Sequence, residues 1–271
     1  MKRLFILFVL SQVICIQLIL ASNIDSVKVF SHSMEKDINT LIITPENYDA
    51  SNNYSVIYLL HGYGDNHKGW TAKGTIVREL ADKYNFIVVC PDGDTSWYFD
   101  SPIDSTYQYE TFISKELVRW VDENYSTKTS RTARAITGLS MGGHGGLYVG
   151  IRNQDVFGAC GSMSGGVDLR PFPNNWDIAK RLGSQSEYPQ NWEENSVINL
   201  LHLVTPNSIK IIFDCGTDDF FYDVNVKLHN EMLYRNIQHD FISRPGGHTW
   251  NYWQNAVKYQ FMFFDDYFTS K

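Results

Sequence analysis

The chain has 271 residues, enough for one large α/β domain or two small domains with a substantial core. Apolar residues make up 43% of it and charged residues 20%, a composition that indicates a globular protein and excludes an intrinsically disordered one. The net charge is -7 and the sequence has no basic cluster, which argues against nucleic acid or an anionic membrane surface as the partner.

Residues 1–22 differ in composition from everything that follows. Lys2 and Arg3 lead into an almost uninterrupted apolar run, which ends at the small residues Ala21 and Ser22. This layout is typical of a secretory signal peptide. A membrane-anchoring helix is the alternative, because the run approaches the length of a bilayer span. We favour the signal peptide and expect a secreted or periplasmic protein with no membrane span after cleavage.

Three cysteines lie beyond this leader, at Cys90, Cys160 and Cys215. An odd number spread this widely is not a disulfide framework. Each lies at or near the end of an apolar run of β type, so we expect buried free thiols. A single disulfide stays open if two of these runs are neighbouring strands.

Eight segments have the composition of β-strands. The first two, residues 26–33 and 37–45, are joined by a polar turn and predict an antiparallel hairpin at the sheet edge. The others are mostly short, apolar and β-branched, which is typical of strands buried on both faces of a parallel sheet. These span residues 54–62, 84–93, 133–140, 157–166, 208–216 and 238–247.

Helical segments alternate with these strands. They span residues 71–84, 109–125, 142–153, 224–236 and 251–268. Strand and helix alternation of this kind predicts a doubly wound α/β domain with a mostly parallel sheet, and no linker or repeat divides residues 23–271.

Residues 164–207 interrupt the alternation. They contain four prolines and two tryptophans and offer only short helical stretches. Long irregular insertions are often functional lids, while an elaborate connection between a strand and the next helix would look the same in sequence. Both interpretations stay open.

The glycine-rich stretch AITGLSMGGHGG, residues 135–146, joins a predicted strand to a predicted helix. Within it, residues 138–142 fit the pattern G-x-S-x-G, in which a tight turn exposes a serine at the edge of a sheet. Glycine avoids a Cβ clash on either side of such a turn. Ser140 would then lie at a helix N-terminus, where N–H groups favour developing negative charge. A glycine-rich loop that only packs a helix on a sheet is the structural alternative.

Two further segments place chemistry-bearing residues after predicted strands. His248 lies in the loop PGGHTW, and Asp218 and Asp219 lie in FDCGTDDFFYD. Taken singly, a lone histidine is more often structural or solvated, and paired acids after a strand are usually part of a turn or a helix N-cap. Their order along the chain, serine, acid and histidine, is the order expected of α/β-hydrolases.

The candidate roles follow from the chemistry of acyl transfer. His248 would take the proton of Ser140 during attack and return it to the leaving alcohol, while an aspartate holds the imidazole. Two N–H groups would stabilise the oxyanion: the backbone of Met141 and, by our preference, that of Tyr63. We expect no cofactor, and no metal, because no histidine or carboxylate cluster has ligand spacing.

Five segments carry a family resemblance, in the family's order: YLLHGYGDNHKGW, PDGDTSWYFDSP, GLSMGGHGG, CGTDDFFY and GGHTWNYW. The chain resembles the esterase D and antigen 85 branch of the α/β-hydrolases, which includes feruloyl, acetyl-xylan and tributyrin-type esterases. The resemblance covers nearly all of the chain after the leader. One departure is Asp94, where relatives often have a second glycine after PDG.

The resemblance implies specific site residues. It selects Asp219, the third residue after the glycine of the CGT turn, as the catalytic acid. It assigns the oxyanion hole to Tyr63 and Met141, and it places Trp97 and Tyr98 in the cleft wall facing the substrate. Aromatic residues at these two positions, and at 176 and 192, are candidates to stack on a sugar or feruloyl ring or simply to pack in the core.

The activity that the resemblance implies is hydrolysis of a carboxylic ester. Export favours a polymer-derived carbohydrate ester, such as feruloylated or acetylated xylan, over the cytosolic substrate S-formylglutathione. The alternatives are a general short-chain carboxylesterase, an acyltransferase that uses the same acyl-enzyme, and a non-catalytic carbohydrate-binding homologue. The last is disfavoured, because a binding module does not need all of Ser140, Asp219 and His248.

Overall fold

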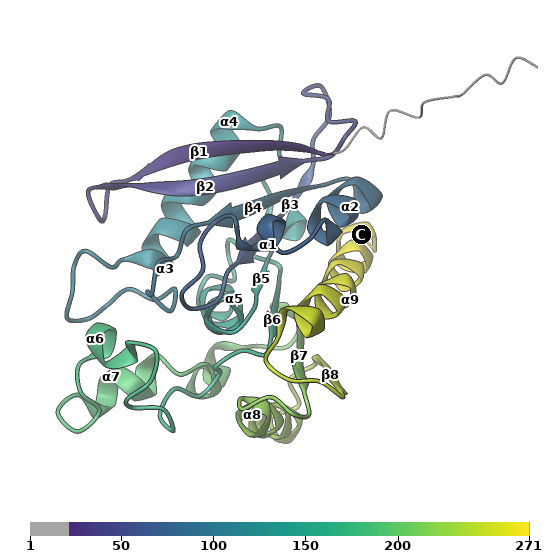
Figure 1. Cartoon of the computed structure of the whole chain (residues 1–271). Coiled ribbons are helices and arrows are strands. Elements are labelled where there is room, and N and C mark those ends of the chain that lie inside the picture. The colour runs from purple at the N-terminus through teal and green to yellow at the C-terminus, as the bar shows by residue number, and fades with distance from the viewer. Residues whose placement is uncertain (1–21, 271) are drawn as a thin grey trace, which may run out of the picture.

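The computed structural model describes residues 22–270, so the expected signal peptide at residues 1–22 lies, apart from Ser22, outside the described residues. Eight strands form one sheet in the order β1-β2-β4-β3-β5-β6-β7-β8 (Figure 1). Their bounds are β1 Asn23–Ser31, β2 Lys36–Thr44, β3 Ser55–Leu60, β4 Phe86–Pro91, β5 Arg134–Gly138, β6 Ala159–Met163, β7 Lys210–Gly216 and β8 Asp240–Arg244. Every predicted strand is therefore present.

The sheet is antiparallel at one edge and parallel elsewhere. Strand β1 pairs antiparallel with β2 along its whole length, from Asn23 opposite Thr44 to Ser31 opposite Lys36. Strand β2 also runs antiparallel to β4, and the remaining neighbours are parallel. The predicted N-terminal edge hairpin and the mostly parallel α/β sheet are both confirmed.

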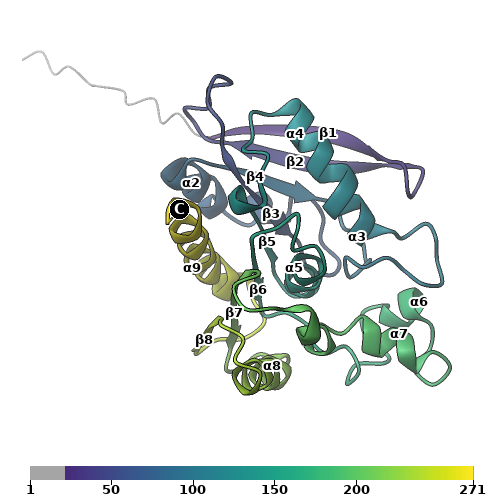
Figure 2. The same cartoon turned by 180° about the vertical axis from the view of Figure 1, so that it is seen from behind.

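Helices cover both faces of the sheet, as the two opposite views show (Figures 1 and 2). Their bounds are α1 Gly69–Ala72, α2 Ile76–Tyr84, α3 Tyr109–Thr111, α4 Val118–Asn124, α5 Met141–Arg152, α6 Ile178–Leu182, α7 Pro189–Glu194, α8 Tyr222–Tyr234 and α9 Trp250–Thr269. A π-helical stretch, Phe112–Leu117, joins α3 to α4. Within the described residues, no helix is long and apolar enough to span a bilayer.

Strand β3 shows why the sheet is buried on both faces. Its side chains at 56, 58 and 60 enter the core beneath α3–α5 and α8, while those at 57 and 59 enter the core beneath α1, α2 and α9. Alternate side chains of a strand point to opposite faces, so a strand between two helical layers must be apolar throughout. The continuous apolar run VIYLL meets that requirement.

The segment 164–207 contains α6, α7 and two single-turn 3₁₀ helices, Val197–Asn199 and Leu201–Leu203. In both views α6 and α7 lie at one end of the molecule beside the loop that leads to α3 (Figures 1 and 2). Several of its apolar side chains belong to the core; Trp192 is fully buried and donates its indole N–H to the Gly183 carbonyl at 3.0 Å. Trp192 therefore packs in the core rather than facing a substrate.

The three described cysteines are free and buried. Burial raises the pKa of the Cys90 thiol to about 12, and it also raises the pKa values of Cys160 and Cys215. Because the thiolate is the reactive form, we expect none of the three to react with a disulfide reagent at pH 8 until the protein is unfolded. Mass spectrometry of peptides labelled before and after guanidinium addition checks this, and a labelled native peptide would contradict it.

Candidate active site

The turn between β5 and α5 holds Ser140 in a conformation that few residues other than glycine adopt. Its φ is 55° and its ψ is -116°, a strained combination of the kind found at functional sites. The turn lies against β3: a Cβ at Gly138 would lie 2.6 Å from the Leu60 carbonyl oxygen, and one at Gly142 would lie 2.5 Å from it. The glycines of G-x-S-x-G are therefore required by the backbone packing around Ser140.

Ser140, His248 and Asp219 form a continuous hydrogen-bonded chain. The Ser140 Oγ lies 2.9 Å from His248 Nε2. On the other side of the ring, His248 Nδ1 lies 2.9 Å from Asp219 Oδ2 and 3.1 Å from Oδ1. These side chains come from three loops that follow β5, β7 and β8, so the carboxyl ends of parallel strands bring them together.

The two neighbouring acids have different surroundings. Asp219 is buried and also accepts the backbone N–H of Phe221 at 2.9 Å, which fixes the carboxylate beneath His248. Asp218 is exposed, and its backbone N–H donates to the Gly246 carbonyl at 2.9 Å. Of the two acids, the structure brings Asp219 to the histidine.

The loop after β3 lies directly against the serine. A Cβ on Gly62 would come within 3.4 Å of the Ser140 Cβ, so the peptide that carries the Tyr63 N–H passes close to the hydroxyl. His61 orients this peptide: its Nε2 accepts the Gly93 N–H at 2.7 Å, which leaves its Nδ1–H to donate to the Gly62 carbonyl at 2.8 Å. In a trans peptide the Tyr63 N–H then points away from His61.

Met141 is the first residue of α5. The first N–H groups of a helix have no acceptor within the helix and lie at the positive end of its dipole. The backbone N–H of Met141 follows Ser140 directly, so it is available to an oxygen bound at the serine.

Trp97 and Tyr98 do not face the cleft, and this expectation is corrected. Their side chains are 1% and 0% exposed, and both residues have a positive φ, 58° and 62°. The Tyr98 hydroxyl donates to the His61 carbonyl at 3.0 Å, and the Trp97 indole donates to the Trp176 carbonyl at 3.1 Å. Both rings support the cleft loops from beneath.

A cavity of about 440 Å³ opens at Ser140 and His248. Five aromatic side chains line its walls. Tyr63 and Trp176 were candidates from the sequence, whereas Phe220, Trp250 and Trp253 were not. Each of the three lies within a few residues of Asp219 or His248, in segments already singled out for their acid and base. Proximity in the chain to a predicted site residue was the signal that could have identified them.

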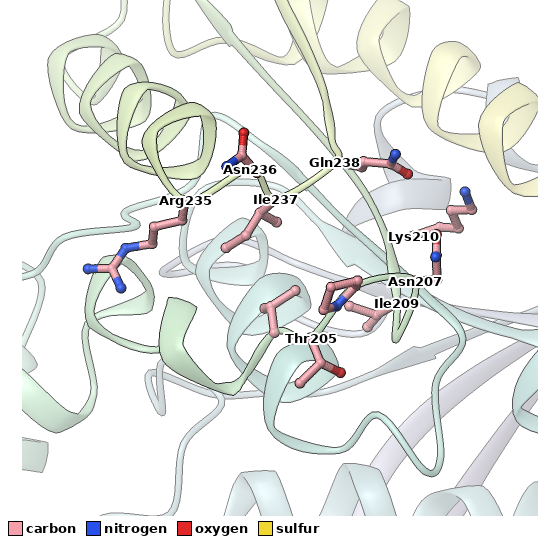
Figure 3. A pocket seen from close by; sticks show the side chains of 10 residues that line it. Thr205, Asn207, Ile209, Lys210, Arg235, Asn236, Ile237 and Gln238 are labelled. Carbon is pink, nitrogen blue, oxygen red and sulfur yellow. The ribbon is translucent and has the colours of Figure 1, made fainter.

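A second, smaller cavity of about 110 Å³ lies away from these residues, between the start of β7 and the turn from α8 to β8 (Figure 3). Its lining includes Thr205, Asn207 and Ile237, and the Arg235 side chain extends away from them. It contains no nucleophile paired with a base, so the candidate active site is the cavity at Ser140.

The arrangement is suited to acyl transfer without a metal. A serine hydroxyl paired with an imidazole, itself oriented by a buried carboxylate, is the arrangement that activates a weak nucleophile. Within residues 22–270, no group of three or more histidine, cysteine or acidic side chains is placed to hold a metal ion.

The sheet order and the serine, acid and histidine at its carboxyl edge define an α/β-hydrolase. A family model described as "Putative esterase" matches residues 31–263, and the chain belongs to this family. It is a carboxylic ester hydrolase, which confirms the class implied by the sequence motifs.

Named relatives agree with this class. The chain is 27% identical over 225 residues to an acetyl esterase of Caldicellulosiruptor saccharolyticus, covering 76% of this chain and 82% of that one. It is 31% identical over 158 residues to an endo-1,4-beta-xylanase/feruloyl esterase of Xylanibacter ruminicola, covering 54% of this chain but 22% of that longer protein. A solved ferulic acid esterase superposes with a TM-score of 0.78 at 27% identity, covering 91% of this chain and 98% of the other.

Proposed function

We propose that the chain is a secreted serine esterase that hydrolyses feruloyl or acetyl esters of plant cell-wall xylan. The observation that carries the proposal is the hydrogen-bonded chain from Ser140 through His248 to Asp219, which opens into an aromatic cavity. In this assignment Ser140 is the nucleophile, His248 is the general base and acid, and Asp219 orients the imidazole.

The reaction proceeds in two halves, acylation of Ser140 and hydrolysis of the acyl-enzyme. As the Ser140 Oγ bonds to the ester carbon, its proton passes to His248 Nε2, and the backbone N–H groups of Tyr63 and Met141 receive the oxyanion. The carbon–oxygen bond to the alcohol then breaks, and His248 gives the proton to the departing oxygen. Water then gives a proton to His248 Nε2 as its oxygen bonds to the acyl carbon. The bond from that carbon to Ser140 Oγ breaks, His248 returns the proton to Oγ, and the carboxylic acid leaves.

Two observations support the substrate class and the location. The relatives named for acetyl and feruloyl esters point to these acyl groups, and one of them carries a xylanase activity in its name. The signal-peptide pattern of residues 1–22 supports export, where such polymers are found.

A substrate panel tests the proposal. We compare methyl ferulate and acetylated xylo-oligosaccharides with p-nitrophenyl esters of rising acyl length, after correcting each kcat/KM for the reactivity of the leaving group. We expect the corrected kcat/KM to be higher for the ferulate or the acetylated xylo-oligosaccharides. S-formylglutathione serves as the comparison for the cytosolic alternative. A steady preference for plain short acyl chains would replace the xylan assignment with a general carboxylesterase.

A further inference from the structure

One hydrogen bond joins two loops beside the cavity at Ser140. The Tyr63 hydroxyl, on the loop after β3, donates to Asp177 Oδ2 at 3.1 Å, although the two residues are 114 positions apart. Tyr63 lines the cavity, and Asp177 directly precedes α6 in the segment 164–207. This hydrogen bond, called the latch below, ties that segment to the loop that carries the proposed oxyanion N–H.

The Asp177 end of the latch is a strained stretch of backbone. Trp176 and Asp177 both have positive φ, 47° and 55°. Such conformations are unfavourable for a non-glycine residue and persist only where the surroundings enforce them. The contacts that hold this stretch include the Trp97 indole on the Trp176 carbonyl, at 3.1 Å, and the Tyr63 and Lys180 contacts to the Asp177 carboxylate. The Trp176 ring also packs against neighbouring aromatic rings.

The acceptor of the latch is an ionised carboxylate at neutral pH. Lys180 Nζ lies 3.0 Å from Asp177 Oδ1, and Lys180 together with Tyr63 holds the pKa of Asp177 below its usual range. A hydrogen bond to a charged acceptor is stronger than one between neutral groups. The latch is therefore suited to fix the orientation of the neighbouring Trp176.

Trp176 belongs to a pair of stacked rings that leads to the proposed general base. Its ring stacks on Phe220 with centroids 5.4 Å apart and planes inclined by 20°. The ring centroid of Phe220 in turn lies 4.2 Å from that of His248, and Phe220 is 52% exposed. We call Trp176 and Phe220 the aromatic shelf: both rings line the cavity, and the shelf extends outward from His248.

The chemistry of the proposed reaction decides which half of the ester meets this shelf. His248 must deliver a proton to the departing alcohol oxygen, so that oxygen has to lie within hydrogen-bond reach of Nε2. Two cavity rings adjoin the imidazole: the centroid of Phe220 lies 4.2 Å from that of His248, and the centroid of Trp253 lies 4.8 Å from it, so a group attached to that oxygen passes beside them. Phe220 is the nearer of the two and the one that continues into Trp176. Flat apolar surfaces, such as an aryl ring or the face of a sugar, pack well on aromatic side chains.

We propose that the aromatic shelf binds the alcohol half of the ester, and that Asp177 is a positioning residue that holds the shelf in place through the latch. This inference rests on the proposed serine-esterase function. In this assignment, selectivity for the alcohol depends on the hydrogen bond between Tyr63 and Asp177, whose side chains take no part in making or breaking bonds of the substrate.

The experiment compares phenyl acetate with ethyl acetate, which share one acyl group and differ in the alcohol. In Asp177→Ala and in Tyr63→Phe, we expect the ratio of kcat/KM for phenyl to ethyl acetate to fall about three- to tenfold, mainly through KM. The double variant should fall no further than the lower single variant, because both changes break the same bond. Asp177→Asn retains an acceptor oxygen and tolerates positive φ, so it should restore most of the ratio.

Tyr125→Phe is the matched control. Its hydroxyl also donates to an exposed aspartate, Asp25 Oδ2, at the same 3.1 Å, and neither residue lines the cavity. Both rate constants should stay at the wild-type values in this variant. Equal losses on both acetates in Asp177→Ala, or additive losses in the double variant, would overturn the inference while leaving the esterase intact. A wild-type protein that hydrolyses neither acetate would instead refute the proposed function.

Discussion

Replacing Ser140 with alanine is expected to lower kcat for ester hydrolysis on the order of 10⁶-fold, with little change in KM. The physical reason is that the Ser140 Oγ, 2.9 Å from His248 Nε2, is the only atom in the arrangement positioned to form the acyl-enzyme. Steady-state hydrolysis of p-nitrophenyl acetate, measured beside a buffer blank, gives the loss. The alanine side chain fits the turn without a new contact, so the folded protein should persist, as thermal unfolding would show.

The same experiment extends to His248, because members of a catalytic unit do not contribute independently. His248→Ala should cost a similar factor, and the double variant should be hardly slower than either single one. Losses that multiply in the double variant would mean that the two residues act separately. Full activity in Ser140→Ala would refute the serine mechanism outright.

The elements that the sequence predicted well are those whose signal is local. The strands β3 and β4 were visible as continuous apolar runs because each must face two helical layers, and α9 was visible through its long apolar spacing. The sheet order, with β4 between β2 and β3, depends on packing between distant segments and has no local pattern. The short helices α6 and α7, of five and six residues, are too brief to show a period.

The residues of the candidate site also differ in whether their signal is local or depends on tertiary packing. The G-x-S-x-G turn around Ser140 is a local backbone requirement, so the sequence displayed it directly. The residues alone do not separate Asp218 from Asp219, and only the family resemblance selected Asp219; their difference in burial arises when the loop folds under His248. Variants at Ser140, His248 and Asp219 test the predicted catalytic roles.

The positions of the aromatic side chains were the least well predicted from the sequence. Trp97 and Tyr98 stand in an aspartate-rich segment that looks like an exposed loop, yet both residues have a positive φ and both rings are buried in the core. A φ angle of this sign is set by tertiary contacts such as the hydrogen bond from Tyr98 to the His61 carbonyl. The family resemblance placed Trp97 and Tyr98 in the cleft wall, whereas the aromatic residues that line the cavity are Tyr63, Trp176, Phe220, Trp250 and Trp253.

The Asp219→Ala variant is expected to lose about 10⁴-fold in kcat, whereas Asp218→Ala should stay within about twofold of wild type. Without the buried carboxylate at 2.9 Å from Nδ1, the imidazole of His248 is free to rotate or to present the wrong tautomer to Ser140. The carboxylate also stabilises the imidazolium that forms during attack. Asp218 is exposed, so its removal disturbs neither function. The measurement is kcat for p-nitrophenyl acetate in both variants.

Asp219 also accepts the Phe221 N–H at 2.9 Å, so alanine there removes a structural contact together with the catalytic one. Asp219→Asn separates the two effects, because its amide oxygen still accepts the Phe221 N–H while its NH₂ group donates toward His248 Nδ1 and favours the tautomer with the proton on Nε2. That tautomer cannot accept the serine proton. We therefore expect the asparagine variant to lose about 10⁴-fold in kcat with a thermal midpoint close to wild type. Equal losses at positions 218 and 219 would contradict the assignment, because they would show that neither carboxylate is specifically coupled to the histidine.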